Sequence, residues 1–411
     1  MNTGEKMKNV IETLQEKYNN VARNDKAKLA KFLKRRRMEL GYTLEEVSDG
    51  ICSTSYLSKI ENCQVEVDDN YYHMLFEKLH LEYQSIVEHR MVPIYTEIIK
   101  AYLKDDRAFI ESKLNGIVGN NAYCDTEIEM LVVIYNLIGG SMEEASTSIR
   151  KLELVKNTLS LDELLFLSFL NVVYDYKTYR FDAVKENIEV LLRSSTTDEV
   201  MHLAIIDLAL NYYYEAGFKA QFYHLYAEYL NHPLKKIFSR IELIHSLQEL
   251  VLLGEERDDL DDQFYLLNSI TPPELLSIYH YYYGCYLINK KAYEQAFLLM
   301  QNEPNTVQNL TVMGISVNRI NDFNVSIEYL QILKNQDLTI NGPYEEFLDY
   351  MRLKLEQYGY SYLHNYLKHQ ILPHQKRYQC AFLLKEEEHE YQKVAFELGR
   401  YKEVVKAFLK I

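Results

Sequence analysis

The sequence contains few of the residues that interrupt helices. It has only 14 glycines and 7 prolines in 411 residues, whereas an average composition would supply roughly 50 of the two together. This scarcity argues against a turn-rich β-sandwich and against a disordered chain. The prolines fall between apolar stripes and never inside a strong one, as expected of connections between helices.

Cysteine is also scarce, and long apolar runs are missing. The five cysteines are an odd number without CxxC spacing, which favours a reducing compartment over a disulfide framework. No run of roughly 18 uncharged apolar residues predicts a transmembrane helix, and the N-terminal residues lack the apolar segment of a secretory signal. We therefore expect a cytoplasmic protein with no membrane partner.

Motifs for catalysis are missing as well. The sequence contains no GxxxxGK[ST], GxSxG or HExxH pattern, so nothing in it predicts an enzyme, and we expect no metal or other cofactor. Residues 258–262 match the DDxxD pattern with which helical isoprenoid synthases hold magnesium diphosphate. A second magnesium motif is absent at the required spacing, so we interpret this run as a solvated loop or the start of a helix.

The charge of the chain is unevenly distributed. A net charge of −15 argues at first against nucleic acid as a partner. Residues 1–64, however, carry 12 Lys and Arg against 9 Asp and Glu, whereas the remaining residues carry 33 against 51. Residues 1–64, which we call the head, therefore have a net charge of +3, whereas the remaining residues have a net charge of −18. The head can still bind DNA.

Apolar periodicity predicts five helices in the first ninety residues, at 7–22, 27–40, 44–50 and 54–62 and from Tyr71 onward. Only helical periodicity follows Pro93. We therefore predict three parts, which are an amphipathic helix at 1–25, a small helical domain at 26–89 and a repeat domain at 90–411.

Capping residues support the short helices of this head. Thr43 is the expected N-cap of the third helix, with Glu46 completing a capping box. Ser53 is expected to cap the fourth helix and Asn70 the fifth. Gly41 is expected to end the second helix in a left-handed conformation.

Residues 37–63 carry the strongest local signal. They predict two short helices joined by a tight turn, and the second has a polar outer face. Such a helix can enter the major groove of DNA, where short polar and donor-bearing side chains meet base edges. Ser53 and the first backbone N–H groups of this helix could meet a phosphate. The candidate DNA contacts on the helix are Thr54, Ser55, Tyr56, Ser58 and Lys59, and sequence-independent attraction is expected from Lys31, Lys34, Arg35 and Arg36.

This stretch resembles the helix-turn-helix of the lambda-repressor or Xre type. The resemblance implies a buried ion pair between Arg37 and Glu61 and a backbone contact from Asn62 to DNA. It also implies that Ser53 caps the recognition helix and that Thr54, Ser55 and Lys59 face the bases. There are two departures from the family pattern. Leu44 stands where the family usually has a Gln that contacts DNA, and the turn is one residue shorter than the common form.

The remaining residues contain a loose internal repeat. A turn, an aromatic residue or Met, and a small residue recur around positions 142, 181, 218, 293, 323 and 401. The mean interval is about 37 residues when the two long steps count double. The pattern resembles degenerate tetratricopeptide repeats over roughly 95–411 and predicts an α-solenoid, with an irregular helical bundle as the alternative. Small residues such as Gly284 and Gly314 should let paired helices approach, while the aromatic residue fills the gap at each turn.

The short turn and recognition helix at 50–62 resemble those of the RNPP (Rap, NprR, PlcR, PrgX) family of peptide-pheromone regulators. The resemblance implies a quorum-sensing transcription regulator that reads a double-stranded DNA operator as a homodimer. It further implies that asparagines on the first helix of each repeat clamp a short signalling peptide, with tyrosines beside them. The candidate peptide-binding residues are Asn171, Asn211, Asn289, Asn318, Tyr213 and Tyr282.

Two alternatives to this function stay open. A Rap-like repeat domain would instead bind a response regulator of a phosphorelay and sequester or dephosphorylate it. The repeats could also only dimerise a constitutive regulator that has no ligand. Each candidate asparagine could equally be a helix-surface residue, and each tyrosine could simply pack between helices.

Overall fold

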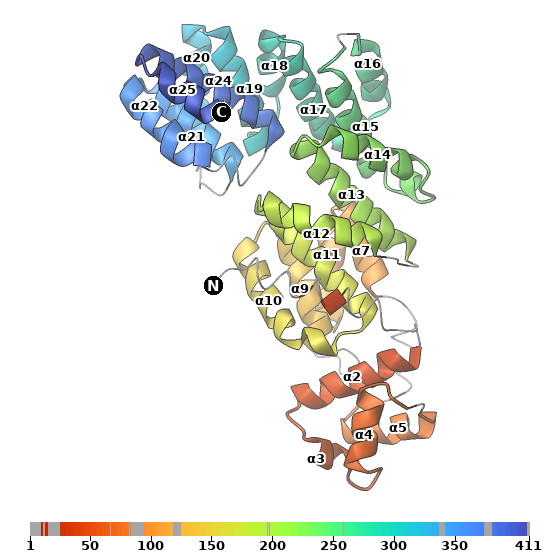
Figure 1. Ribbon diagram of the computed structural model, residues 1–411. Coiled ribbons are helices and arrows are strands. Elements are labelled where there is room, and N and C mark those ends of the chain that lie inside the picture. The colour runs from red at the N-terminus through yellow and green to blue at the C-terminus, as the bar shows by residue number, and fades with distance from the viewer. Residues whose placement is uncertain are drawn as a thin grey trace. The chain divides into compact units, whose positions relative to one another are not determined.

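The structure is a computed structural model, and every regular element in the residues that it describes is a helix (Figure 1). The described residues are 10, 13–14, 25–65, 67–81, 83, 94–117, 125–194, 196, 198–257, 259–336, 342–373 and 380–408. The predicted all-α fold is confirmed. The chain divides into two compact units, residues 1–177 with 183–205 and residues 178–182 with 206–411.

Two of the predictions concern residues that are largely outside these ranges. The amphipathic helix predicted at 7–22 is described only at residues 10 and 13–14, where Val10 and Leu14 are fully buried. The predicted boundary near residue 89 also lies outside the described residues. The division of the chain into three parts therefore stays a prediction.

Four helices of the first unit form a helix-turn-helix domain: α2 (Asp25–Glu39), α3 (Leu44–Ser48), α4 (Thr54–Glu61) and α5 (Asp69–Lys78). All four contribute to one hydrophobic core, because each turns an apolar stripe toward the others. The central side chains of this core are Phe32, Leu33, Val47, Leu57, Ile60, Tyr72, Leu75 and Phe76.

Local capping explains where the short helices begin. The Glu46 N–H donates to Thr43 Oγ1 at 3.2 Å, and the Thr43 N–H donates to the Glu46 carboxylate at 2.7 Å, which is the predicted capping box. The Tyr56 N–H donates to Ser53 Oγ at 3.1 Å, so Ser53 caps α4 as predicted. Gly41, after α2, has the expected positive φ of 72°.

The predicted cap of α5 is wrong. Asp68 caps this helix, because its carboxylate accepts a hydrogen bond from the Asn70 N–H at 2.9 Å. The helix consequently begins at Asp69 rather than at Tyr71. A carboxylate near the positive end of the helix dipole is favourable as well, which Asn70 could not provide.

Helical hairpins fill the rest of the first unit. Their elements are α7 (Ile94–Lys104), α8 (Arg107–Ile117), α9 (Asp125–Gly139), α10 (Met142–Val155), the 3-10 helix η1 (Lys156–Thr158), α11 (Leu161–Lys177) and α12 (Phe181–Arg193). The following helix, α13 (Glu199–Glu215), contains the division between the units at residues 205 and 206.

The second unit continues the hairpins. Its helices are α14 (Lys219–Leu230), η2 (Lys235–Ile237), α15 (Ser239–Leu253), α16 (Asp261–Ile270), η3 (Pro273–Leu275), α17 (Leu276–Asn289), α18 (Tyr293–Met300), α19 (Val307–Ile320), α20 (Phe323–Lys334), α21 (Pro343–Leu355), α22 (Tyr360–Tyr366), a π-helical turn (Leu367–Ile371), α24 (Ala381–Glu397) and α25 (Tyr401–Phe408). The first helices of successive hairpins, α15, α17, α19 and α21, pack against one another.

A left-handed residue recurs at the hairpin turns and explains the repeat seen in the sequence. In seven hairpins it lies two positions before the second helix, and these residues are Asp105, Gly140, Tyr179, Gly217, Lys291, Asn321 and Gly399. Its positive φ ends the first helix as a C′ residue does. The predicted anchors fall at the first residue or the N-cap of α10, α12, α14, α18, α20 and α25, and α16 and α22 fill the two long steps. The predicted solenoid of hairpins is confirmed.

Small residues in the first helices do allow close approach. A Cβ added to Gly314 would lie 2.6 Å from Tyr329 Oη, and one added to Gly284 would lie 3.2 Å from Met300 Cε. The expectation that the aromatic anchors fill the turns is wrong for two of them. Phe323 is 69% exposed and Tyr401 is 57% exposed, because both rings point to solvent at the start of their helices. Within the described residues, no helix has the length and apolar character needed to span a membrane.

Candidate nucleic-acid interface and peptide site

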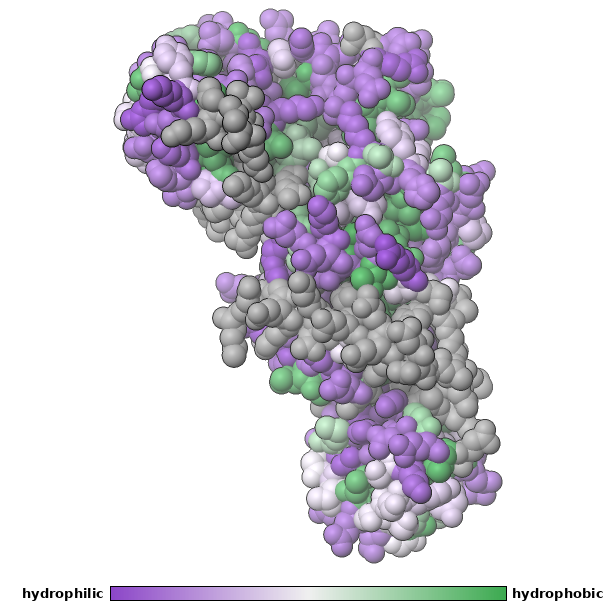
Figure 2. Space-filling model, in the orientation of Figure 1, coloured by the Kyte–Doolittle hydropathy of each residue, from purple (hydrophilic) through white to green (hydrophobic). Residues whose placement is uncertain are grey.

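Helix α4 has two chemically different faces. Leu57, Ile60 and Glu61 are buried against the rest of the helix-turn-helix domain. Ser53, Thr54, Ser55, Lys59 and Asn62 are exposed, while Tyr56 and Ser58 are half-buried. The surface of this domain seen in Figure 2 is mostly hydrophilic or intermediate, with isolated hydrophobic side chains. The outer face of α4 therefore consists of the short polar side chains and the lysine that the sequence singled out.

A buried ion pair fixes the inner face of α4. Arg37 Nε donates to Glu61 Oε1 at 2.6 Å, and Arg37 Nη2 donates to Glu61 Oε2 at 2.9 Å. The guanidinium therefore binds the carboxylate through two parallel hydrogen bonds. The third nitrogen, Arg37 Nη1, donates to the Tyr42 carbonyl at 2.8 Å. The Glu61 side chain is only 2% exposed. The ion pair implied by the family resemblance is present, and it holds the last turn of α4 to the end of α2.

Asn62 and Lys34 lie together beyond this pair. Lys34 Nζ donates to Asn62 Oδ1 at 3.0 Å, and Asn62 Nδ2 donates to the Ser58 carbonyl at 2.8 Å. Lys34 is thereby placed beside the outer face of α4, where its positive charge can meet a phosphate. The structure thus brings Lys34 to the end of α4 although Lys34 and Asn62 are 28 residues apart in sequence.

The other arginines of the basic run lie elsewhere. Arg36 pairs with Glu39 at 3.5 Å, and its side chain is 14% exposed. Arg35 is only 2% exposed and pairs with Glu163 of α11 at 2.8 Å. Arg36 is consequently a weaker candidate for a phosphate contact than Lys34, and Arg35 is not accessible to DNA in this conformation.

Aromatic side chains support α4 from behind. The Tyr56 ring meets the Tyr71 ring of α5 edge to face, with centroids 5.6 Å apart. Such pairs contribute about 0.5–1.5 kcal/mol beyond their buried area. Tyr56 therefore helps to orient α4 against α5, and this contact was not visible in the sequence.

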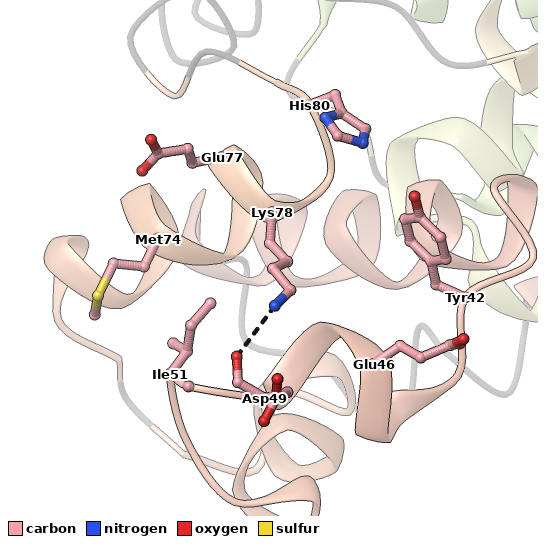
Figure 3. A pocket seen from close by; sticks show the side chains of 9 residues that line it. Tyr42, Glu46, Asp49, Ile51, Met74, Glu77, Lys78 and His80 are labelled. Atoms are coloured by element: carbon pink, nitrogen blue, oxygen red, sulfur yellow. Dashed lines mark hydrogen bonds between the residues drawn. The ribbon is translucent and has the colours of Figure 1, made fainter.

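The helix-turn-helix domain also contains a cavity of about 640 Å³ between α3, the turn after it and α5 (Figure 3). Lys78 reaches across it, and its Nζ donates to the Asp49 carbonyl at 3.3 Å. Hydrogen bonds from the Thr43 N–H and hydroxyl hold the pKa of Glu46 below its usual value. With Glu46, Asp49 and Glu77 in its wall, this cavity is unsuited to a phosphate, and it belongs to a different surface from the outer face of α4.

In the second unit, two predicted peptide-binding residues meet in one hydrogen-bonded cluster. Gln248 Nε2 donates to Asn211 Oδ1 at 2.8 Å and to Tyr282 Oη at 3.1 Å. His245 connects this group to Asp207, since its Nδ1 lies 2.8 Å from Gln248 Oε1 and its Nε2 lies 3.0 Å from Asp207 Oδ1. Burial raises the pKa of Tyr282, so its hydroxyl remains protonated.

Sequence reasoning missed three members of this cluster. Asp207 precedes Asn211 by four residues on α13, and His245 precedes Gln248 by three on α15. Both spacings put the two side chains on one helix face. These pairs of polar residues on otherwise apolar helices could have indicated a buried polar cluster. The contact between α13 and α15, however, cannot be predicted from either segment alone.

The remaining candidate asparagines have different surroundings. Asn289 Nδ2 donates to the Val251 carbonyl at 3.2 Å, so this side chain ties α17 to α15. Asn318 Nδ2 donates to Glu390 Oε1 at 2.9 Å, and Asn318 Oδ1 accepts from Lys354. Asn171, in the first unit, is 1% exposed, and neither atom of its amide has a hydrogen-bond partner among the described residues.

Asn318 belongs to a buried charge network in the last repeats. Lys354 Nζ lies 2.6 Å from Glu390 Oε2, and the Tyr350 hydroxyl donates to the same oxygen at 2.7 Å. Burial lowers the pKa of Lys354. Burial would raise the pKa of Glu390, but the Lys354 charge and the hydrogen bonds that it accepts outweigh this and lower it. The network explains why a polar side chain such as Asn318 is tolerated there without a ligand.

The candidate tyrosines pack within the second unit. Tyr213 is 8% exposed and lies against Tyr212 and Phe218, with centroids 5.5 and 6.4 Å away. Tyr282 is 9% exposed and lies against Tyr214, 5.7 Å away. The structure therefore brings Asn211 and Tyr282 together within the second unit, whereas Asn171 belongs to the first. A role of any of these residues in binding a peptide stays a prediction.

Comparison with known proteins gives little further assignment. No family model matches the sequence, and no curated protein matches it. Among solved structures, the crystal structure of Bacillus thuringiensis PlcR in complex with the peptide PapR7 and DNA is similar, with 16% sequence identity and a TM-score of 0.23. The match covers 89% of this chain and 98% of that chain. The function proposed next therefore rests on the residues of this chain.

Proposed function

We propose that this protein is a DNA-binding transcription regulator whose repeats bind a short signalling peptide. The observation that carries the proposal is the outer face of α4, where Thr54, Ser55 and Lys59 are exposed on a helix fixed from behind. A recognition helix must present base-reading side chains in a defined orientation, and the Ser53 cap and the Arg37–Glu61 pair provide that orientation.

The distribution of charge supports the same division of tasks. The head of the chain is net positive and contains α4, whereas the remaining residues have a net charge of −18. DNA attracts the first and repels the second, so approach to a duplex favours one orientation of the molecule. The acidic repeats instead suit a cationic or neutral peptide.

For the regulatory step we propose a homodimer that reads a roughly palindromic operator. The peptide would change the geometry of the dimer and thereby its affinity for DNA. The change can only be as large as the difference in peptide affinity between the two geometries, commonly about 1–3 kcal/mol. The resemblance of residues 50–62 to the RNPP family supports this part of the proposal.

The reading of DNA can be tested with two lysine variants. Duplexes selected from a random pool give the preferred sequence, and fluorescence anisotropy gives affinities at several salt concentrations. Lys59→Ala should lose about 1–3 kcal/mol of preference for that sequence, because its side chain faces the bases. Lys34→Ala should weaken all duplexes alike and reduce the salt slope by about one, because it meets a phosphate.

The matched control is Lys151→Ala, whose side chain is 63% exposed on α10 and pairs with Glu129. It removes the same charge outside the helix-turn-helix domain and should leave affinity and preference unchanged. If Lys59→Ala keeps the full sequence preference, the outer face of α4 is not the reading surface. If the unaltered protein selects no sequence, the DNA-binding function itself is wrong.

The peptide part needs a separate measurement. Calorimetry of the full chain with short synthetic peptides identifies a ligand, and DNA affinity is then measured with and without it. We expect a change of roughly 5–150-fold in DNA affinity. A peptide that binds but alters neither DNA affinity nor oligomeric state would refute the switch and leave the DNA-binding function standing.

A further inference from the structure

Helix α2 is held on one side by the first repeats. Arg35, in its third turn, is 2% exposed, and its Nη2 lies 2.8 Å from Glu163 Oε1. The Glu163 side chain is itself 6% exposed. Both charges have therefore left water, and each depends on the other, since a buried charge without its partner is strongly unfavourable.

The Glu163 side chain is also held by hydrogen bonds within its own helix. Its Oε2 accepts a hydrogen bond from the Ser160 N–H at 2.7 Å, and its own N–H donates to Ser160 Oγ at 3.3 Å. This reciprocal pair is a capping box at the start of α11. One carboxylate oxygen thus belongs to the first turn of α11, while the other faces α2.

The same short segment of α2 also holds the recognition helix. Arg37 grips Glu61 in the last turn of α4 with bonds of 2.6 and 2.9 Å. Arg35 and Arg37 are two residues apart, so they point to different sides of one helix. A helix does not bend over two residues without losing backbone hydrogen bonds, and the start of α11 and the end of α4 are therefore rigidly linked through α2.

We propose that Arg35 and Glu163 are positioning residues that fix the DNA-reading domain on the first repeats. The buried pair sets the orientation of α4 relative to α11, so that a rearrangement of α11 is transmitted to the reading surface. Neither residue touches DNA in this arrangement. The proposal rests on the proposed DNA-binding function, but the ion pair can be tested without DNA.

The first test measures hydrogen exchange in the full chain. Residues 156–163, comprising η1 and the first turn of α11, lie against α2. Arg35→Gln should accelerate their amide exchange at least about fivefold, because the covering domain separates from them. The amides of α4 should stay as slow as before. Unchanged exchange at 156–163 would overturn the proposal.

Matched variants separate the ion pair from the capping box. Glu163→Gln keeps an N3 side chain that can cap the helix but loses the charge. Ser160→Ala removes the cap and keeps the charge. The double variant Arg35→Gln with Glu163→Gln restores a neutral pair that can hydrogen-bond, so its exchange should return toward that of the unaltered protein. If Ser160→Ala reproduces the effect of Glu163→Gln in full, the cap and not the ion pair is responsible.

The second test measures what orientation does for DNA reading. Selected half-sites are placed at their preferred spacing, or with about five base pairs inserted, which turns one half-site by half a helical turn. The unaltered protein should bind the second duplex at least about tenfold more weakly, and Glu163→Gln should discriminate severalfold less. Its affinity for a single half-site should stay within about twofold, because α4 is intact.

Failure of the two hypotheses gives different results. If the unaltered protein does not distinguish the two spacings, the dimeric reader of the proposed function is wrong, and the exchange measurement decides the role of the ion pair. A different outcome would be that Glu163→Gln weakens binding to a single half-site by as large a factor as it weakens the discrimination between spacings. In that case Glu163 supports the fold of the helix-turn-helix domain and does not position it.

Discussion

Replacing Glu61 by Gln should weaken the helix-turn-helix domain far more than the loss of an exposed ion pair would. The Glu61 side chain is 2% exposed and accepts two bonds from Arg37, at 2.6 and 2.9 Å. Hydrogen bonds to charged groups contribute roughly 1.5–3 kcal/mol each, and breaking a buried pair costs about 3–5 kcal/mol. Arg37 keeps its bond to the Tyr42 carbonyl and is 12% exposed, so we expect the lower limit, about 3 kcal/mol.

Native-state hydrogen exchange is the appropriate assay, because a chain of this size need not unfold in one step. The amides of Leu57 and Ile60, both fully buried in α4, report opening of this domain. A loss of about 3 kcal/mol corresponds to exchange that is roughly a hundredfold faster. Lys151→Gln, which breaks an exposed pair, should change exchange in α10 by no more than about 1 kcal/mol.

A smaller effect would refute this reasoning. If Glu61→Gln accelerates exchange less than about threefold, the bidentate pair does not support α4, and the apolar core alone determines its orientation. The double variant Arg37→Gln with Glu61→Gln supplies the coupling energy of the pair directly. A coupling near zero would lead to the same conclusion.

Two further predictions concern the second unit. Glu390→Gln should cost about 3 kcal/mol by native-state hydrogen exchange of the α24 amides, because it leaves the Lys354 ammonium largely buried without a counter-charge. The folded state lowers the pKa of Glu390. Its contribution to the free energy of unfolding is therefore complete above the usual pKa of 4.5 and is lost as pH falls through the folded pKa. The stability of the variant should consequently decrease less steeply with acid than that of the unaltered protein. Gly314→Ala should cost roughly 1–3 kcal/mol, because its methyl group would lie 2.6 Å from the buried Tyr329 hydroxyl. The control is Gly116→Ala on α8 of the first unit, where a Cβ would meet nothing within 4 Å among the described residues. It should instead stabilise α8 by up to about 1 kcal/mol, and native-state hydrogen exchange in each helix compares the two variants.

The turns of the solenoid could be predicted because each depends on a few adjacent residues. A left-handed residue followed two positions later by a helix start produces a local pattern, and it was visible where the residue is glycine or asparagine, as at Gly140 and Asn321. It was not visible at Asp105, which takes the same conformation without a characteristic side chain. The hairpin that starts its second helix at Asp261 has neither the aromatic nor the small residue of the pattern. The hairpin that starts its second helix at Tyr360 has Leu363 where the pattern has a small residue, so both appeared only as long steps.

The exposed face of α4 was also predictable from adjacent residues, but the ion pairs that hold α4 and α2 in place were not. Exposure of Thr54 and Lys59 follows from the helical period alone. The Arg37–Glu61 pair joins residues 24 apart, and only the family resemblance indicated it. The contact between Arg35 and Glu163 joins residues more distant still, and no spacing rule connects them. Contacts of this kind depend on how helices pack, which side-chain periodicity does not determine.

The asparagines of the repeats differ in what a ligand could gain from them. A peptide that used Asn211 would have to replace the bond from Gln248, and one that used Asn318 would have to separate it from Glu390. Exchanging one hydrogen bond for another contributes little net free energy. Of the four candidates, Asn171 has an amide with no partner among the described residues, so a new bond there relieves an existing cost.

Asn171 also lies on a helix through which a ligand could change the orientation of the helix-turn-helix domain. It lies on α11, eight residues after Glu163, which is about 12 Å along the helix. Because its side chain is 1% exposed, a peptide can reach it only if the surroundings of α11 open. Opening at α11 changes the helix whose first turn holds Arg35, and α2 connects that arginine to the end of α4. A peptide bound at Asn171 would therefore act on a helix of the compact unit that contains the reading surface, whereas Asn211 and Asn318 belong to the other unit.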